Sequence, residues 1–346
     1  MTDHVLYRKH RPKTFGGVLG QDHVVKILKN ALKLDRVAHA YLFSGSRGTG
    51  KTSVARILAR AINCEKNEPC NSCQTCVDFM SGRTLDLVEI DAASNRGIDE
   101  IRAIRDAANF LPVSAKRKVY IIDEVHMLTK EAFNALLKTL EEPPSHVVFI
   151  LATTEPEKVP ETISSRCQHL RFYRLSDEVA SESIFKVAKA EGFEIEPEAA
   201  ETLALFSEGS LRDAMNLLGQ VSVLAGGKSS EIKAGDVRVF FGAPAQSAVS
   251  ELVSAIGEKD SKRAFECLRS AFKDGSDPRI FTKILIRDFR NKFLGVLNGG
   301  PEIQNFPADR LERVLLILLD TSSARLFSPH RELPLELAVH KIIRET

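Results

Sequence analysis

The eight residues Gly45-Ser46-Arg47-Gly48-Thr49-Gly50-Lys51-Thr52 match the phosphate-loop pattern G-x-x-x-x-G-K-[ST] at every fixed position. Glycines allow the backbone angles that aim successive N–H groups at phosphate oxygens, Lys51 adds a positive charge, and Thr52 offers a hydroxyl to Mg²⁺. An apolar segment, 40–43, precedes the loop, and a segment with helical spacing, 53–61, follows it. The sequence therefore predicts that the chain binds a nucleoside triphosphate.

Four short apolar runs, rich in β-branched residues, predict strands. They span 40–43, 85–90, 119–122 and 147–151, and helical patterns lie between them. Strands that alternate with helices favour a parallel sheet covered on both faces, with ligand-binding groups at the carboxyl ends of the strands. The phosphate loop follows one of these ends.

The rest of the chain is predicted to be helical. Amphipathic patterns at 177–191, 198–206 and 211–224 indicate a small helical domain, and the Gly- and Ser-rich segment 226–230 is the clearest linker. Helical spacing continues from residue 245 without a catalytic motif, which favours a packing or assembly role. The predicted domains are 1–173, with an insert at about 62–80, then 174–228 and 229–346.

The composition tells more about the class of protein than about the partners that it binds. Lys and Arg total 48 against 46 for Asp and Glu, so net charge says little about nucleic acid or membrane binding. Residues 1–9 contain no apolar signal core, and the longest apolar run, 314–319, is too short to span a bilayer. These features predict a cytoplasmic protein with no membrane partner.

Two carboxylates, Asp123 and Glu124, end the predicted strand at 119–122. On their own, adjacent acids at a strand end would indicate only a solvated turn. Beside a phosphate loop, they indicate a hydrolytic site. Asp123 would then hold Mg²⁺ with Thr52, and Glu124 would orient or activate the attacking water. His126 is expected to be structural or regulatory rather than a base.

Three further polar residues give weaker evidence of a catalytic role. Thr154 follows the strand at 147–151, where its hydroxyl can reach water or the terminal phosphate, although β-branched threonines often simply finish a strand. Arg166 and Arg212 each follow short polar residues. Spacing alone favours surface ion pairs for both arginines.

Four cysteines are spaced as Cys64-x₅-Cys70-x₂-Cys73-x₂-Cys76 in a hydrophilic insert. Four thiolates complete a tetrahedral, closed zinc site, so the sequence predicts structural Zn²⁺, with free thiols as the alternative. The other two cysteines, Cys167 and Cys267, are predicted to be buried packing residues.

The sequence resembles the gamma/tau family of bacterial DNA polymerase III, the clamp-loader ATPases within the AAA+ superfamily. The resemblance covers nearly the whole chain, and the Ser-Arg-Cys motif with Glu-Glu-Pro-Pro is its most specific part. The segments that carry it are 7–12, 18–21, 45–52, 122–128, 137–144, 152–154, 165–167 and 209–213. It implies an α/β AAA+ domain with a parallel sheet covered by helices, a small helical lid and an all-α collar.

The resemblance also implies roles for particular residues. Thr154 would be the first sensor, Arg212 the second sensor, and Arg166 an arginine finger that acts on a neighbouring subunit. The adenine would be bordered by Tyr7, Arg11, Val18 and Leu19.

The partners implied by the resemblance are the delta and delta prime subunits, further copies of the chain in a pentamer, a ring-shaped sliding clamp and primer-template DNA. A C-terminal extension would contact polymerase and replicative helicase. Arg96 and Arg102 are candidates for tracking the DNA backbone, while the apolar segment 110–112 either contacts the clamp or ends a helix in the core. The alternatives are a Holliday-junction branch-migration motor and a scaffold that binds ATP without hydrolysing it.

Overall fold

The computed structural model describes residues 5–66, 68–226, 231–299, 305–323 and 329–345. The chain divides into two compact units, 1–231 and 232–346, and each is described by itself. Most of the predicted linker, 227–230, lies outside the described residues.

The first unit is built on a five-stranded parallel sheet with strand order β2-β3-β4-β1-β5. Four of the strands match the predicted runs: β1 (Ala40–Ser44), β2 (Leu87–Asp91), β3 (Lys118–Asp123) and β4 (Val147–Thr153). This sheet confirms the predicted α/β fold. Because β1, β3 and β4 are flanked on both sides, their residues are almost all buried.

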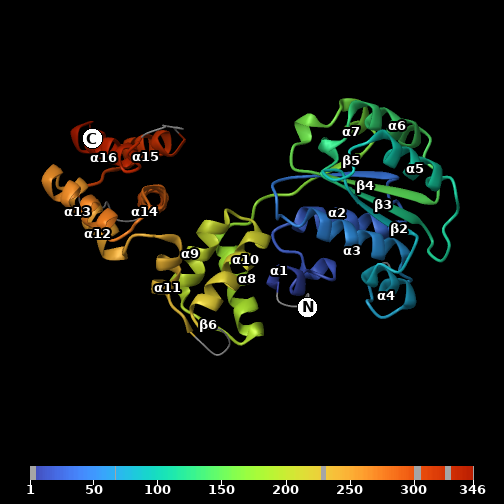
Figure 1. Cartoon of the computed structure of the whole chain (residues 1–346), viewed down its shortest axis with the longest axis horizontal. Helices are drawn as coiled ribbons and strands as arrows, with labels where there is room; N and C mark the ends of the chain where they lie inside the picture. The colour runs from blue at the N-terminus through green and yellow to red at the C-terminus, as the bar shows by residue number, and fades with distance from the viewer. Residues whose placement is uncertain (1–4, 67, 227–230, 300–304, 324–328, 346) are drawn as a thin grey trace. The chain divides into compact units, whose positions relative to one another are not determined.

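Helices cover both faces of the sheet, as Figure 1 shows. On one face, α2 (Asp22–Lys33) and α3 (Lys51–Asn63) pack against side chains such as Phe43, Ile121 and Ile150. On the other face, α5 (Ile98–Ala108) and α6 (Lys130–Glu141) pack against the alternate residues, among them Leu42, Ile122 and Leu151. Successive strand residues point to opposite faces, so each strand contributes to two separate cores.

The strand β5 (Gln168–Arg171), which pairs with β1 at the edge of the sheet, is not predicted by the sequence pattern. Only Leu170 of its four residues is buried, so it lacks the apolar run that identifies the other strands. The predicted strand at 85–90 also begins too early, because Leu85 is 75% exposed and β2 starts at Leu87.

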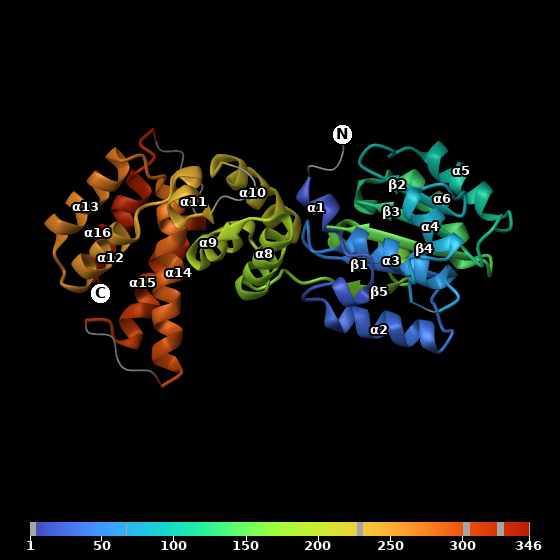
Figure 2. The same cartoon turned by 90° about the horizontal axis from the view of Figure 1, so that it is seen from below.

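A group of three helices completes the first unit. These are α8 (Asp177–Glu191), α9 (Pro197–Ser207) and α10 (Leu211–Leu224), and they confirm the predicted helical pattern (Figure 2). Side chains of Ser176 and Ser210 cap α8 and α10 by accepting backbone N–H bonds. The remaining short elements of the chain are α1 (Leu6–Lys9), η1 (Phe15–Gly17), α4 (Gln74–Ser81), η2 (Val125–Met127), η3 (Pro156–Lys158), α7 (Glu161–Ser164), β6 (Glu194–Ile195) and β7 (Glu231–Ile232).

The second unit is helical, as predicted. Its helices are α11 (Ala234–Phe241), α12 (Gln246–Gly257), α13 (Ser261–Lys273), α14 (Pro278–Leu297), α15 (Ala308–Ser323) and α16 (Leu333–Glu345). One core that includes Phe281, Phe289 and Leu318 holds α12 to α16 together.

Among the described residues, no single helix has the length and apolar composition needed to cross a membrane. Helices α11 and α12 meet these criteria only as a pair that is bent by 74°.

Candidate nucleotide and metal sites

The phosphate loop lies between the end of β1 and the start of α3. Gly45 and Gly48 have φ angles of 147° and 77°, which L side chains rarely adopt. A Cβ atom on Gly45 would lie 2.3 Å from the carbonyl oxygen of Phe172, and one on Gly48 would lie 2.0 Å from Oγ of Ser210. Both glycines are therefore required by close packing as well as by backbone conformation.

Lys51 and Thr52 begin α3 and point to different partners. Lys51 donates hydrogen bonds from Nζ to the carbonyl oxygens of Gly45 (2.7 Å) and Ser46 (3.0 Å). Burial lowers the pKa of Lys51. Thr52 donates its hydroxyl to Oδ2 of Asp123 at 2.7 Å, so two oxygen donors of the kind that Mg²⁺ prefers lie together. The predicted pair of magnesium ligands is thus brought into contact across 71 residues of sequence.

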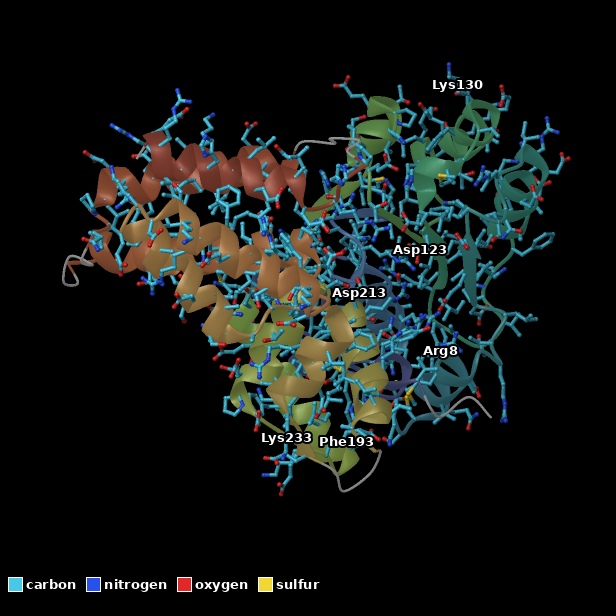
Figure 3. The ribbon with its side chains drawn as sticks, turned by 60° about the vertical axis from the view of Figure 1, so that its left-hand side comes forward. Arg8, Asp123, Lys130, Phe193, Asp213 and Lys233 are labelled. Atoms are coloured by element: carbon cyan, nitrogen blue, oxygen red, sulfur yellow. The ribbon has the colours of Figure 1, made fainter. Side chains whose placement is uncertain are left out.

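Glu124 lies at the end of β3 and contacts the end of β4. Its Oε2 atom accepts hydrogen bonds from the Thr154 hydroxyl (2.9 Å) and the Thr154 backbone N–H (3.3 Å). Its own φ of 49° turns the chain sharply after Asp123, whose position is labelled in Figure 3. Because β3 and β4 are adjacent and parallel, these predicted residues lie together at the carboxyl ends of the two strands.

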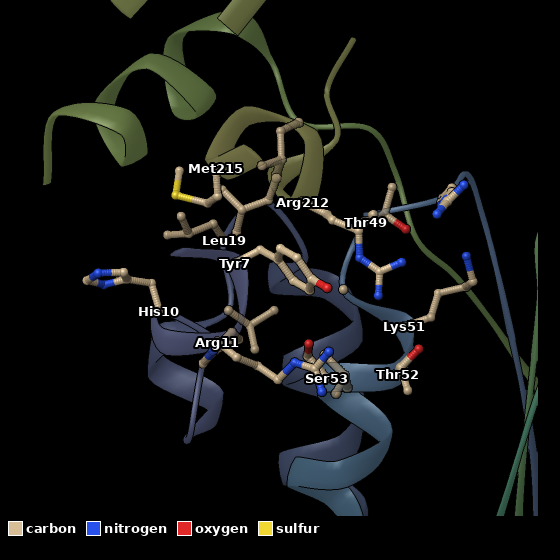
Figure 4. Close-up of a pocket in the computed structure, with 18 of the residues that line it drawn as sticks. Tyr7, His10, Arg11, Leu19, Thr49, Lys51, Thr52, Ser53, Arg212 and Met215 are labelled. Atoms are coloured by element: carbon tan, nitrogen blue, oxygen red, sulfur yellow. The ribbon is translucent and has the colours of Figure 1, made fainter. Parts of the chain in front are cut away.

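Most of the predicted adenine and phosphate residues line one pocket (Figure 4). In the view of Figure 4, Leu19 and Met215 lie toward one end, Lys51 and Thr52 lie toward the other, and Tyr7 lies between them. The lining includes these predicted residues: Tyr7, Arg11, Val18, Leu19, Arg47, Gly48, Thr49, Gly50, Lys51, Thr52, Asp123, Glu124 and Arg212. Gly45, Ser46, Thr154 and Arg166 are not among the lining residues.

Sequence reasoning missed part of this lining. The additional residues are His10, Pro12, Gly17, Ser53, Val54, Leu175, Leu211 and Met215. Two groups of these residues adjoin predicted ones in the sequence: His10, Pro12 and Gly17 lie beside predicted adenine contacts, and Ser53 and Val54 follow the phosphate loop. Their position in the sequence could therefore have identified them as lining residues. Leu175, Leu211 and Met215 lie near or in the helical group, and their apolar side chains are typical of ordinary core positions.

Arg212 connects the helical group to the N-terminal segment. Its guanidinium carbon lies 5.3 Å from the centre of the Tyr7 ring, within the range of a cation–π contact. Arg11 lines the same pocket, and its pKa is lowered by burial and then by the nearby charges of Arg56 and Arg212. This concentration of partly buried positive charge suits an anionic ligand.

Arg166 follows α7 and forms its hydrogen bonds elsewhere. It donates from Nη2 to Oε1 of Glu141 at 2.7 Å and from Nη1 to the carbonyl oxygen of Thr162 at 2.8 Å. Its side chain is 36% exposed. The residue is thus available at the surface and not enclosed in its own pocket.

The four cysteines of the insert converge. The Sγ atoms of Cys64, Cys70, Cys73 and Cys76 all lie within 4.8 Å of one another, and Cys70 and Cys76 are 3.9 Å apart. Zn–S bonds of about 2.3 Å place tetrahedral sulfur ligands about 3.8 Å apart, so the cluster fits Zn²⁺. Backbone N–H groups of Ser72 and Cys73 lower the pKa of Cys70 to about 5, which favours the thiolate that a metal requires.

The other two cysteines, predicted to be buried packing residues, are less buried than expected. Cys167 and Cys267 are only partly buried, and each packs at the margin of a hydrophobic core. Burial nevertheless raises the pKa of Cys167 to about 12.

An apolar turn follows α5. Phe110, Leu111 and Val113 are 70%, 73% and 74% exposed, so the segment does not end the helix in the core. The fully buried carboxylate of Asp86 holds this turn by accepting backbone N–H bonds of 2.8 Å from Val113, Ser114 and Ala115. We call Phe110, Leu111 and Val113 the apolar tip.

Comparison with known proteins places the chain in a family. The DNA polymerase III subunit gamma of Buchnera aphidicola subsp. Schizaphis graminum is 35% identical over 100% of this chain and 99% of its own length. This chain belongs to the DNA polymerase III gamma/tau family. The tau subunits of Bacillus subtilis and Escherichia coli are 42% and 43% identical, over 99% and 89% of this chain. The chain spans 63% and 47% of the lengths of these two relatives.

Family models and solved structures also match parts of the chain. A model described as DNA polymerase III, delta subunit, matches residues 20–176, and one described as the clamp loader ATPase lid domain matches residues 180–227. The structure of the Thermotoga maritima RuvB Holliday junction branch migration motor has a TM-score of 0.52 and 22% identity, over 71% of this chain and 79% of its own. That likeness shows a shared fold.

Proposed function

We propose that this chain is the ATP-hydrolysing motor subunit of a replicative clamp loader, which opens a sliding clamp and places it on primed DNA. The observation that carries the hydrolytic part is the convergence of Lys51, Asp123, Glu124 and Arg212 on one pocket. We assign residues 1–173 to the nucleotide-binding domain, 174–228 to the lid and 229–346 to the collar.

The phosphate end of the pocket supports ATP binding by this chain's own groups. Backbone N–H groups of residues 45–52 would bind phosphate oxygens, and Lys51 would exchange its two carbonyl partners for the terminal phosphates. Thr52 and Asp123 would hold Mg²⁺, which when bound neutralises phosphate charge. The Glu124 side chain would accept a hydrogen bond from the attacking water and align it with the terminal phosphate.

The opposite end of the pocket suits adenine. Tyr7, Val18, Leu19 and Met215 offer ring and aliphatic surface, and Arg212 would reach from the lid to the phosphates as the second sensor. Because these groups come from both the core and the lid, bound ATP would join the two parts.

Arg166 would complete the site of a neighbouring subunit. Its pairing with Glu141 supports this role because the side chain is kept at the surface and away from its own pocket. A guanidinium presented to the terminal phosphate in trans stabilises transition-state charge and is worth about 10³ to 10⁵ in rate. Hydrolysis would then depend on assembly with delta, delta prime and further copies of the chain in a pentamer.

Other surfaces are proposed to serve the clamp, DNA and zinc. The apolar tip would press on the clamp, since its side chains are exposed and the Asp86 carboxylate holds the backbone at its C-terminal end. Arg96 and Arg102 would contact the DNA backbone, although Arg102 now pairs with Asp99 at 3.2 Å.

Structural Zn²⁺ would stabilise the insert through the four clustered cysteines. Longer members would reach polymerase and helicase through a C-terminal extension.

ATPase turnover of the purified chain, measured with and without delta, delta prime, clamp and primed DNA, tests this proposal. A clamp loader should be stimulated by clamp and primed DNA together. Stimulation by a Holliday junction in the absence of clamp would instead support a branch-migration motor. Wild-type protein that binds ATP but never hydrolyses it would support a nucleotide-gated scaffold.

A further inference from the structure

His126 lies between two carboxylates on different parts of the first unit. Its Nδ1 atom is 3.5 Å from Oε2 of Glu124, which lines the nucleotide pocket. Its Nε2 atom is 3.1 Å from Oε1 of Glu155, which lies just before η3 and is not among the pocket-lining residues. The His126 side chain is 5% exposed, whereas Glu155 is 39% exposed. The imidazole therefore links Glu124 to a carboxylate nearer the surface.

A closed set of contacts fixes the orientation of this imidazole. His126 Nδ1 is 3.0 Å from the hydroxyl oxygen of Thr153, and that hydroxyl also accepts the backbone N–H of Glu155 at 3.0 Å. The Glu155 carboxylate then returns to His126 Nε2. A turn of the ring away from this position would break the contacts at both nitrogens. The two hydrogen bonds that meet at the Thr153 hydroxyl also polarise one another.

The same short segment holds Glu124 directly. Thr154, between Thr153 and Glu155, donates both its hydroxyl and its backbone N–H to Oε2 of Glu124. That oxygen is also the Glu124 atom nearest His126 Nδ1. Residues 153–155 therefore act on Glu124 by two routes, one through Thr154 and one through the imidazole.

We propose that His126 and Glu155 are positioning residues for Glu124, with Glu155 acting through His126. The inference rests on the proposed function, because it concerns the carboxylate that would align the attacking water. Misplacement of a reacting group by about 1 Å can cost about 10²-fold in rate. Glu155 thus sets the rate of hydrolysis from outside the pocket, without contact with the nucleotide.

A purely structural role for His126 makes a different prediction. A buried, hydrogen-bonded imidazole that only stabilises the fold would, when replaced, lower the melting temperature and leave kcat of the folded fraction unchanged. A positioning role lowers kcat while the affinity for ATP stays the same. The two roles are therefore separated by measuring kcat, ATP binding and melting temperature on the same protein.

Glu155→Gln is the most direct test because it changes a half-exposed residue and keeps the side-chain shape. Glu157→Gln is the matched control, since it removes the same charge from an exposed residue two positions along. With the full chain, alone and with its partner subunits, clamp and primed DNA, we expect kcat to fall about 10- to 100-fold in Glu155→Gln. ATP affinity, measured by equilibrium binding, should change less than about twofold, and Glu157→Gln should match wild type.

A double-mutant cycle tests whether Glu155 acts through His126. His126→Asn keeps a polar group near the position of Nδ1 but cannot reach Glu155. If both residues form one link, the double variant should be no slower than the slower single variant. Multiplied effects would show that Glu155 acts independently and would overturn the proposed route. If His126→Asn fails to fold, Glu155→Gln still decides the role of Glu155.

A measurement that does not depend on turnover is also available. In ¹⁵N-labelled protein without nucleotide, the ring nitrogens of His126 should shift in Glu155→Gln and stay unchanged in Glu157→Gln. Unchanged kcat in Glu155→Gln, or equal losses in both variants, would overturn the inference while wild-type hydrolysis left the proposed function standing. Wild-type protein without any ATPase activity would instead reject the proposed function, and this inference with it.

Discussion

Arg166 donates a 2.7 Å hydrogen bond to Glu141 of its own chain, and it lies outside the lining of the nucleotide pocket. An exposed ion pair of this kind contributes at most about 1 kcal/mol, so a terminal phosphate of a neighbouring subunit can compete for the guanidinium. The pair therefore represents an accessible resting position for the proposed finger.

Arg166→Ala should leave ATP binding by the isolated chain intact and reduce clamp- and DNA-stimulated turnover by about 10³-fold or more. The reason is that the guanidinium acts on charge that develops only in the transition state. Steady-state ATPase of the assembled complex measures the effect. Glu141→Gln is the control, because it keeps the arginine and should retain stimulated turnover. Full stimulation of Arg166→Ala would remove the finger role.

Lys51→Ala should abolish ATP binding. Lys51 is the first residue of α3, and its buried Nζ atom donates to two carbonyl oxygens of the phosphate loop. Its replacement by alanine removes a positive charge from the pocket. Equilibrium titration with a fluorescent ATP analogue measures the loss. Lys33→Ala, on the exposed surface of α2, should bind ATP as wild type does. Micromolar affinity in Lys51→Ala would contradict the phosphate-loop assignment.

Metal analysis of the purified chain should find one zinc ion, held by the cysteines that lie within 4.8 Å of one another. Cys73→Ser removes one of the four sulfur ligands, so it should lose most of the zinc and destabilise the insert. Cys267→Ser, in the second unit, should keep full occupancy. Full zinc content in Cys73→Ser would refute the four-thiolate site.

Asp86→Asn should destabilise the first unit and loosen the apolar tip. Burial alone would raise the pKa of Asp86, but N–H donors from Ser114, Val113 and Ala115 outweigh it and lower the pKa below its usual value. Loss of the charged acceptor should cost about 1 to 3 kcal/mol at neutral pH, measured by denaturant unfolding. Asp35→Asn is the control, because Asp35 is exposed and its φ of 49° suits Asn equally well.

The same carboxylate predicts a dependence of stability on pH. A pKa that is lower in the folded state means that Asp86 stabilises the protein fully above its unfolded pKa of about 3.9, and this contribution is lost as the pH falls below that value. Wild type should therefore lose more stability than Asp86→Asn between neutral pH and acid pH. Parallel pH profiles for the two proteins would contradict the assignment.

Local patterns made much of the fold predictable. Helices α8 and α10 have the predicted bounds, because amphipathic spacing and Ser caps act within a few residues. The sequence pattern did not predict strand β5, because this strand is short and mostly exposed. It is stabilised by pairing with β1 rather than by its own apolar residues.

The sequence by itself determined the phosphate loop, the acidic strand end and the spacing of the four cysteines, because each depends on residue types at fixed local spacing. Tertiary structure alone decided that Arg212 lies over Tyr7, that Asp86 holds the apolar tip, and that His126 links Glu124 to Glu155. These contacts join residues from separate strands, turns and helices. Their partners are selected by how those elements pack, and no local spacing in the sequence encodes that packing.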